Sequence, residues 1–274
     1  MLISVGHPDA RMSGNTPSVT GQRILGAMLF IPVVAVFLVS QAGAQWMFLA
    51  IAGIMVWEFA GMVRLSMPLR LTVLMDFALF ALPAPLFARL ELAAGMSLLP
   101  AVAALAAIVV GFVWMTTRDR VATGFSAAMI LCILAARGLL GLENGHHLFL
   151  SVAAIVASCD ITAYFIGRKI GGPRLAPSIS PNKTRSGAVG GLGAAIIATL
   201  LLMSVMQLNV IEAVIGGAVM AVFAQAGDLL ESMLKRRIGV KDSGNLIPGH
   251  GGFLDRFDGY LLTMPAVYLY SLTV

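Results

Sequence analysis

The chain changes from apolar to polar within residues 210–260, which read VIEAVIGGAVMAVFAQAGDLLESMLKRRIGVKDSGNLIPGHGGFLDRFDGY. The apolar part ends near Asp228, and residues 227–260 then hold five of the thirteen acidic residues and five of the eighteen Lys and Arg residues. A run of about 20 apolar residues is long enough to cross a bilayer as a helix. We therefore expect a membrane-spanning helix that leads directly into a polar segment.

Four polar residues of this segment have the helical spacing i, i+3, i+4 and i+7: Asp228, Glu231, Ser232 and Lys235. If the segment is helical, these residues share one face. Asp255 and Asp258 repeat the i, i+3 spacing. Between the acidic pairs, residues 248–252 read PGHGG, and glycines permit turns whose N–H groups point at an anion. The pattern predicts a metal-assisted phosphate site, and a solvated loop with charges that serve only topology is the alternative.

The composition places the chain in a membrane. Hydrophobic residues make up 59% of it and charged residues only 11%, with a mean hydropathy of +0.92. Soluble domains carry about a quarter charged residues. We expect an all-α, polytopic integral membrane protein. The net charge is +5, and the basic residues concentrate in short loops beside the apolar runs. There they set the orientation and attract anionic headgroups, so no nucleic-acid partner is expected.

Nine apolar runs are candidate spans, at about residues 24–40, 46–63, 71–88, 96–115, 123–141, 148–167, 187–206, 210–228 and 259–274. With the N-terminus in the cytoplasm, sixteen of the eighteen Lys and Arg residues lie on the cytoplasmic side. This bias predicts a multi-pass protein of the inner (plasma) membrane with a periplasmic C-terminus. We divide it into N-terminal helices, residues 1–120, and a catalytic region, residues 121–274, with cytoplasmic loops 168–187 and 229–258.

Acidic residues within apolar runs are a second signal. Asp160 lies well inside a run, where an unpaired charge costs at least about 3 kcal/mol, and Tyr164 follows one helical turn later. The pair predicts a polar cavity that admits substrate, with an ion pair to a Lys or Arg as the alternative. Glu58 and Asp76 lie near cytoplasmic ends of their runs. For them, snorkelling or pairing with a nearby arginine, Arg64 or Arg70, is expected.

The loop at residues 171–193 is rich in Gly, Pro and Ser. Lys183 and Thr184 lead through Gly187 into an apolar run, and together they offer an ammonium, a hydroxyl and helix N-terminal N–H groups to an anion. The spaced glycines of a P-loop are missing. A flexible loop whose glycines serve helix packing is the alternative.

Residues 232–258, SMLKRRIGVKDSGNLIPGHGGFLDRFD, resemble the signature of the phosphatidate cytidylyltransferase (CDP-diglyceride synthase) family. That signature contains a Ser, a Lys-Arg pair, Lys-Asp, Pro-x-His-Gly-Gly and Asp-Arg-x-Asp. Residues 160–167 and 175–184 also resemble the family, which shows Asp-x-x-Ala-Tyr-x-x-Gly and then Leu-Ala-Pro-x-x-Ser-Pro-x-Lys-Thr. The chain departs from the family at Arg185-Ser186-Gly187, where Trp-Glu-Gly or a close variant is usual.

The resemblance implies a nucleotidyltransferase of phospholipid biosynthesis that uses CTP and phosphatidic acid, at the lipid bilayer, to give CDP-diacylglycerol and pyrophosphate. It implies Mg2+ as the cofactor, held by Asp228, Asp255 and Glu231, leaves a second, monovalent cation open, and implies a homodimer. The implied catalytic residues are Asp228, Ser232, Lys241, Asp242, Asp255 and Asp258. The implied substrate-binding residues are Asp160, Tyr164, Lys183, Thr184, Lys235, Arg236, His250, Gly251, Gly252 and Arg256.

Two other functions stay open. A paralogue that activates a different lipid phosphate would use the same residues. An ion-coupled transporter would carry cations on Asp160 and Asp228, but it does not account for the Gly-rich and basic loops on the cytoplasmic side.

Overall fold

The computed structural model describes residues 28, 30–80, 82–83, 86, 88–90, 99–247 and 251–273. Helices form most of this part: α2 (Phe30–Val39), α3 (Gln41–Met62), α4 (Met67–Phe80), α6 (Leu99–Thr117), α7 (Arg120–Gly141), α8 (Gly145–Ile170), α9 (Arg185–Met206), α10 (Val210–Ile238), α11 (Leu254–Phe257) and α12 (Tyr260–Ser271). Two short strands, β1 (Arg174–Ala176) and β2 (Ser180–Thr184), form an antiparallel hairpin between α8 and α9. The chain is therefore mainly helical, as expected for an all-α membrane protein, and the short hairpin is an addition that the sequence did not predict.

Each predicted apolar run contains a helix of ten or more residues in the described part of the chain. Five helices there, α3, α7, α8, α9 and α10, are long and apolar enough to cross a membrane. Three others, α2, α4 and α12, have 10, 14 and 12 residues, which is fewer than the roughly 20 of a straight span. These findings support a membrane protein. The count of nine spans and the sides of the termini stay predictions.

The helix α10 is longer than its apolar run. It continues from the predicted boundary near residue 228 to Ile238, because the added turns consist largely of Leu, Glu, Met, Lys and Arg, which are good helix formers. It ends at Gly239, whose φ of 76° is the left-handed conformation typical of a helix C-terminus. At its start, Asn209 and Glu212 form a capping box. The polar residues after Asp228 thus project from a helix rather than from a loop.

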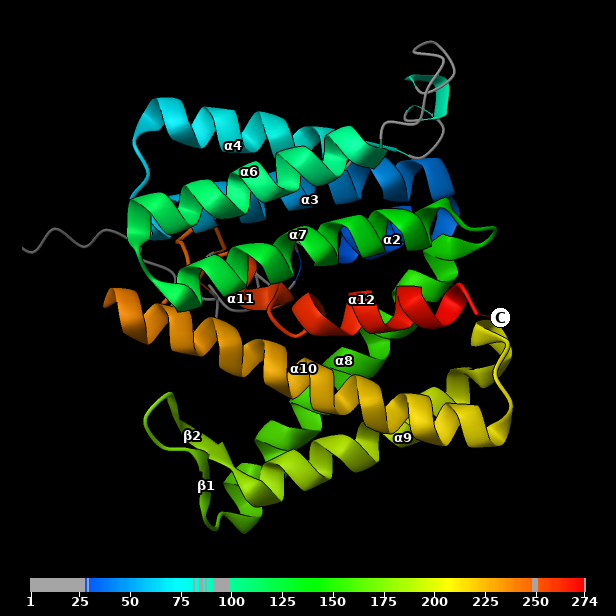
Figure 1. Ribbon diagram of the computed structural model, residues 1–274. Coiled ribbons are helices and arrows are strands. Elements are labelled where there is room, and N and C mark those ends of the chain that lie inside the picture. The colour runs from blue at the N-terminus through cyan, green and yellow to red at the C-terminus, as the bar shows by residue number, and fades with distance from the viewer. Residues whose placement is uncertain are drawn as a thin grey trace, which may run out of the picture.

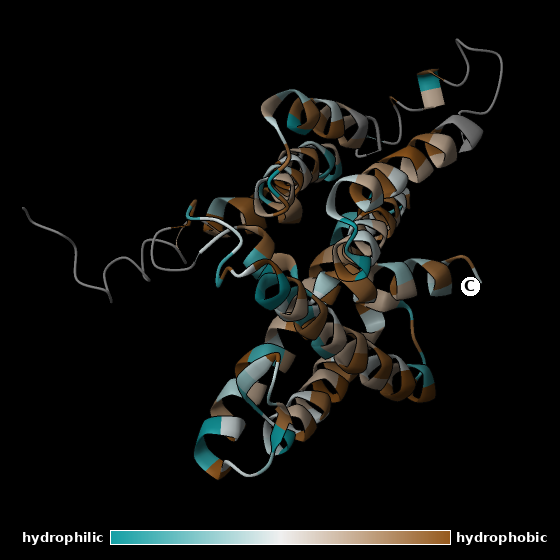
Figure 2. Ribbon diagram, turned by 60° about the vertical axis from the view of Figure 1, so that its left-hand side comes forward, coloured by the Kyte–Doolittle hydropathy of each residue, from teal (hydrophilic) through white to brown (hydrophobic). Residues whose placement is uncertain are grey.

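The helices form two groups (Figure 1). One group contains α3, α4, α6 and α7, and the other contains α8, α9 and α10. The helix α12 lies between them and packs against both α7 and α10. Hydrophobic residues make up most of each long helix, and hydrophilic residues gather at helix ends and connections (Figure 2). Many of the large hydrophobic side chains are exposed on the outside of the helices. This distribution is expected where the surrounding solvent is lipid.

Glycines allow α9 to approach α8 closely. A Cβ atom at Gly187 would lie 2.6 Å from the carbonyl oxygen of Ala163, and one at Gly191 would lie 2.9 Å from that of Cys159. Such contacts are too short for any side chain, so the two helices depend on glycine at these positions. The α8–α9 pair therefore supports glycine packing, the alternative considered for this region, alongside the functional one. It also fixes the position of the hairpin that joins the two helices.

Candidate active site

The four polar residues with helical spacing lie on α10, which confirms the expected helix. The centre of the site is Lys235, whose residue surface is only 9% exposed. Its ammonium lies 2.5 Å from Oε2 of Glu231 on the same helix and 2.7 Å from Oδ1 of Asp255 on α11. Because an unpaired buried charge is strongly unfavourable, this lysine holds the two carboxylates together. Lys235 is thus an internal link between α10 and α11 in this structure.

Asp255 orders the loop that precedes it. Its Oδ2 atom accepts hydrogen bonds from the backbone N–H groups of Ser243 (2.9 Å) and Gly252 (2.8 Å). Burial raises the pKa of Asp255, but the hydrogen bond from Lys235 and those from the two N–H groups outweigh it, so the pKa lies below the usual range. Gly251 has a φ of 80°, and a Cβ there would meet the Asp255 carboxylate. Gly251 and Gly252 therefore let the loop fold tightly around the carboxylate of Asp255.

Glu58 of α3 is part of the same arrangement, which the sequence analysis missed. Its carboxylate, 5% exposed, accepts hydrogen bonds from the hydroxyl of Ser243 (3.1 Å) and from the N–H groups of Phe253 (3.1 Å) and Leu254 (2.8 Å). The expectation that Glu58 pairs with Arg64 or Arg70 is wrong. An acid within an apolar run was the available signal, but its partners lie almost two hundred residues away.

The second part of the site joins the β1–β2 hairpin to α10. Lys183 on β2 forms an ion pair with Asp228 on α10, and the hydroxyl of Ser232 donates to the same carboxylate at 3.3 Å. The charges of Asp228, Lys183 and Arg256 all act on Asp160 of α8. The polar cavity expected around Asp160 and the alternative of an ion pair both stay predictions, and the structure places Asp160 within the influence of this cluster of charges.

Asp258 lies between α11 and α12, and its backbone packs against α10. Gly227 makes this possible, since a side chain there would clash with the carbonyl oxygen of Asp258. Burial, and then the charges of Asp228, Glu231 and Asp160, raise the pKa of Asp258 well above its usual range. The carboxyl group is thus held in a position where ionisation is unfavourable, which is a common feature of functional sites.

Thr184 and Ser186 shape the start of α9. Thr184 is the N-cap residue of the helix, and its hydroxyl accepts a hydrogen bond from the N–H of Gly187 (3.1 Å). The Ser186 hydroxyl donates to the carbonyl oxygen of Gly171 at the end of α8 and lies 3.1 Å from the Thr184 hydroxyl. The residue that departs from the family pattern therefore connects the ends of α8 and α9.

Other predicted site residues lie at the edge of this cluster. Tyr164 is 59% exposed and accepts a hydrogen bond from Arg168 at 3.1 Å. Arg236 is exposed and donates to the carbonyl oxygen of Ile179 at 3.3 Å. Lys241 and Asp242 are exposed residues just after α10. His250 lies outside the described residues.

The site has an excess of negative charge. Apart from Glu58, which is occupied by the hydroxyl and N–H groups of the loop, its described residues include five acidic side chains and three cations, a formal excess of two negative charges when all are ionised. The acidic side chains are Asp160, Asp228, Glu231, Asp255 and Asp258, and the cations are Lys183, Lys235 and Arg256. Oε1 of Glu231 is buried without a hydrogen-bond partner. No three His, Cys, Asp or Glu side chains of the described chain are already arranged as metal ligands. The charge excess and the unpaired oxygen nevertheless fit a divalent cation, because Mg2+ prefers carboxylate oxygens.

A family model described as "Cytidylyltransferase family" matches residues 21–274. A phosphatidate cytidylyltransferase of Brucella abortus biovar 1 is 49% identical over 125 residues, which are 43% of this chain and 44% of the relative. One of Bacillus subtilis is 47% identical over 116 residues, 42% of this chain and 43% of the relative. One of Staphylococcus saprophyticus is 43% identical over 125 residues, 45% and 48% of the two chains. Each match spans less than half of the relative's length.

Removal of the Glu58 carboxylate should release the loop at residues 243–254. Hydrogen bonds to a charged group contribute about 1.5–3 kcal/mol each. We therefore expect Glu58→Ala to lower the free energy of unfolding by at least ~3 kcal/mol, and to speed amide hydrogen exchange in this loop. The matched control is Glu143→Ala in the exposed α7–α8 connection. Equal exchange rates in the two variants would contradict the role of Glu58.

Asp258 and Asp255 should affect stability in opposite directions. The raised pKa of Asp258 means that its contribution to stability falls as the pH rises from the ordinary Asp value, about 3.9, through the raised value. We expect Asp258→Asn to raise the Tm in metal-free detergent at pH 7.5, with a smaller difference at pH 5. Each tenfold change in proton affinity corresponds to about 1.4 kcal/mol, or about 2–4 °C for a chain of this size.

Asp255→Asn is the matched comparison, because the pKa of Asp255 is lowered. Its contribution is present above the ordinary Asp pKa and is lost only as the pH falls through the lowered value. This variant should therefore have a lower Tm at pH 7.5. A lower Tm for both variants would show that Asp258 is not destabilised by its neighbours.

Proposed function

This chain belongs to the cytidylyltransferase family, and we propose from that membership and from the site that it transfers a cytidylyl group from CTP to phosphatidic acid. The products are CDP-diacylglycerol, for phospholipid biosynthesis, and pyrophosphate. The observation that carries the proposal is the ion pair between Lys183 of β2 and Asp228 of α10, which brings the hairpin and the polar part of α10 to one site. The relatives named phosphatidate cytidylyltransferase match about 125 residues of this chain and give the proposal its substrates.

The reaction needs positive charge more than a base. An oxygen of the lipid phosphate forms a bond to the α-phosphorus of CTP, and the bond from that phosphorus to the bridging oxygen of the β-phosphate breaks. Pyrophosphate then leaves with that oxygen. Because the lipid phosphate is already an anion, no proton has to be removed from it, and the main obstacle is repulsion between two anions.

Three cations of the site can offset the repulsion between the two anionic substrates. Lys183 and Arg256 lie among the carboxylates, and Lys235 is held by Glu231 and Asp255. Arginine suits a phosphate group because its planar donors bind two oxygens at once. In the proposal, Arg256 and Lys183 bind phosphate oxygens, while Lys235 fixes the acids that face them. Arg236 and Lys241, at the edge, are assigned to the triphosphate.

Carboxylates next to a phosphate site require a cation between the carboxylate and phosphate oxygens, because both groups are negatively charged. We assign Mg2+ to Asp228, Asp255 and Glu231, with Asp258 and Ser232 in support; when bound, the ion would neutralise phosphate charge and orient the nucleotide. The unpaired Oε1 of Glu231 and the two excess negative charges support this assignment. A second, monovalent cation remains part of the proposal, as does a homodimer.

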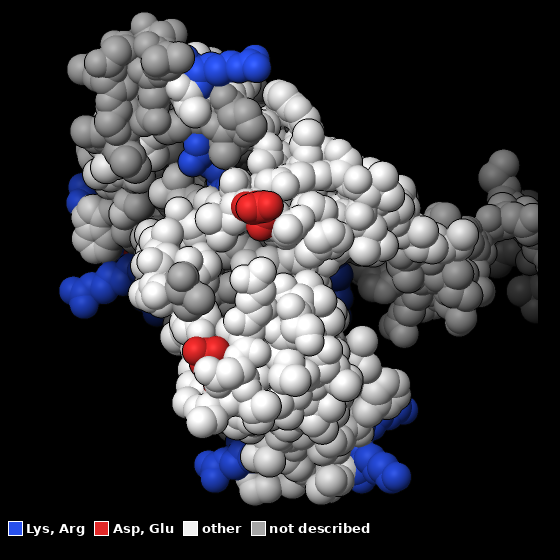
Figure 3. Space-filling model, turned by 90° about the vertical axis from the view of Figure 1, so that its right-hand side faces the viewer, with Lys and Arg blue, Asp and Glu red and all other residues white. Residues whose placement is uncertain are grey.

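The site is assigned to the cytoplasmic face of the inner membrane, where CTP is available. Figure 3 views the end of the molecule that contains the α7–α8 and α9–α10 connections. Two acidic groups lie on this face, and the Lys and Arg side chains appear mainly around its edge. The hairpin and the C-terminal end of α10, with Lys235, Arg236 and Arg237, lie at the opposite end (Figure 1). Basic loops favour the cytoplasmic side, which supports this orientation.

The reaction should depend on both the lipid phosphate and the metal. With purified protein in detergent and labelled CTP, we expect labelled CDP-diacylglycerol from phosphatidic acid and its loss on addition of a chelator. Mg2+ should also raise the Tm of the protein, and Asp228→Asn should abolish this rise together with turnover. Glu212→Gln, at the other end of α10, is the control that should change neither. Turnover of another lipid phosphate in place of phosphatidic acid would identify a paralogue, and unchanged turnover after chelation would exclude the metal.

Reporter fusions test the orientation. A fusion after Val274 should be active as a periplasmic alkaline phosphatase, while reporters inserted near Ser178 or Asn245 should be active only as cytoplasmic proteins. A silent alkaline phosphatase after Val274 would contradict the count of nine spans, because an odd number places the two ends of the chain on opposite sides.

A further inference from the structure

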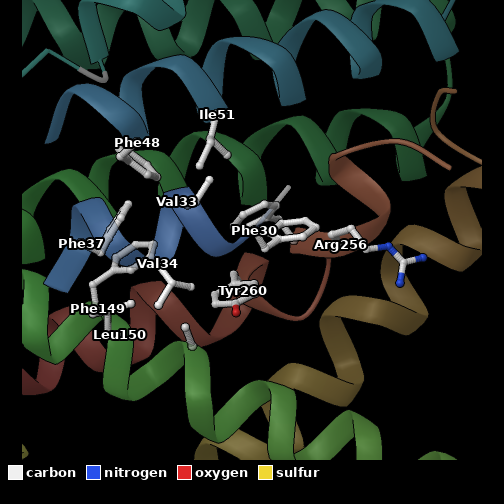
Figure 4. Close-up of a pocket in the computed structure, with 12 residues that line it drawn as sticks. Phe30, Val33, Val34, Phe37, Phe48, Ile51, Phe149, Leu150, Arg256 and Tyr260 are labelled. Atoms are coloured by element: carbon white, nitrogen blue, oxygen red, sulfur yellow. The ribbon is translucent and has the colours of Figure 1, made fainter. Parts of the chain in front are cut away.

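An apolar pocket lies beside the site but outside the carboxylate cluster (Figure 4). Its volume is about 130 Å³, and it is formed by residues of α2, α3 and α8 together with Arg256, Phe257 and Tyr260. Aromatic rings form much of the wall, and Phe37 packs against Phe149 with ring centroids 4.9 Å apart. Among the described residues that line the pocket, Arg256 is the one that carries a charge.

Such a pocket takes up hydrocarbon rather than water. Apolar cavities of about 150 Å³ stay dry and bind apolar molecules, because water inside them finds no hydrogen-bond partners. The pocket also has access to the surroundings of the protein. Val34 lines it and is 44% exposed, and Ile31 and Leu38 on the same helix are 63% and 56% exposed. In a bilayer, these exposed residues of α2 face lipid, so a hydrocarbon chain can enter from the side.

The other end of the pocket meets the carboxylate cluster. Arg256 follows Asp255 directly on α11, and its guanidinium points away from the apolar side chains and toward α10 (Figure 4). Its charge acts on Asp160. Tyr260, which lines the pocket, is under the influence of the charges of Asp160 and Asp258. Arg256 and Tyr260 thus lie between the carboxylate cluster and the apolar part of the pocket.

We propose that this pocket binds part of one acyl chain of the lipid phosphate while Arg256 binds its phosphate group. The proposal rests on the proposed function and assigns the lipid, rather than CTP, to this side of the site. The cytosine of a nucleotide has amino and carbonyl groups that such an apolar wall would leave without hydrogen-bond partners, whereas a lipid phosphate has an anion and an acyl chain next to each other. One guanidinium at the end of the pocket nearest the carboxylate cluster, with apolar side chains along the rest of it, matches that order.

Adjacent alanines of α8 provide a matched pair of variants. Ala153 lines the pocket, whereas Ala154 is exposed on the outer surface of the same helix. Ala153→Phe should fill the pocket, and Ala154→Phe should add the same ring where it meets lipid. Both variants are assayed with dioleoyl and with dihexanoyl phosphatidic acid, since the short chains depend less on the pocket.

We expect Ala153→Phe to raise the KM for the dioleoyl lipid at least tenfold and to leave the KM for CTP and the turnover of the dihexanoyl lipid unchanged. Ala154→Phe should behave as the unaltered protein with both lipids. An unchanged KM of Ala153→Phe for the dioleoyl lipid would overturn the proposal. If the unaltered protein turns over neither lipid, the proposed function itself fails, whereas turnover without chain-length dependence refutes only the pocket.

A second measurement uses the unaltered protein, in case Ala153→Phe does not fold. Phosphatidic acid with a photoreactive diazirine near the end of one acyl chain is irradiated with the protein, and labelled peptides are identified by mass spectrometry. Labels on the segments around Phe37 and Phe149, displaced by unlabelled phosphatidic acid and not by phosphatidylcholine, support the proposal. Labels confined to α9, or displaced equally by both lipids, overturn it.

Discussion

The ammonium of Lys235 between Glu231 and Asp255 is the interaction on which the site depends. A buried charge is stable only with close partners of opposite sign and with their remaining oxygens satisfied. Here Asp255 uses its second oxygen to hold the N–H groups of Ser243 and Gly252, and Glu58 holds the same loop from α3. A chain of contacts thus runs from α10 through the loop at residues 243–254 to the N-terminal helices. The region at residues 1–120 therefore supplies part of the support for the site.

The remaining carboxylates work against stability. Asp160, Asp228, Glu231 and Asp258 repel one another, and when these four and Asp255 are ionised the three cations of the site leave a formal excess of two negative charges. A fold selected only for stability would replace some of these acids, so their retention indicates a function that requires them. Close carboxylates are useful where a cation binds between them and a phosphate group, because the cation supplies the missing positive charge and relieves the repulsion.

The surroundings of the site match an amphiphilic substrate. Polar groups lie at the ends of α8, α10 and the β1–β2 hairpin, while an apolar pocket behind α2 begins at Arg256. Such a boundary between charge and hydrocarbon resembles the boundary of the bilayer itself. A protein that acts on a lipid headgroup can therefore bind the lipid without removing its chains from an apolar environment, which limits the cost of binding.

The sequence alone determined the helical class, the face shared by residues 228–235 and the similarity to the family, because these depend on local spacing and on composition. It also identified most of the acids and cations of the cluster. Only the tertiary structure decided that Lys235 links two acids, that Gly251 and Gly252 serve a loop around Asp255, and that Glu58 pairs with backbone N–H groups rather than with Arg64 or Arg70. Spacing along a helix fixes which residues are neighbours within it. Partners that lie far apart in the chain are chosen by how the helices pack and by which buried polar groups still need a hydrogen bond.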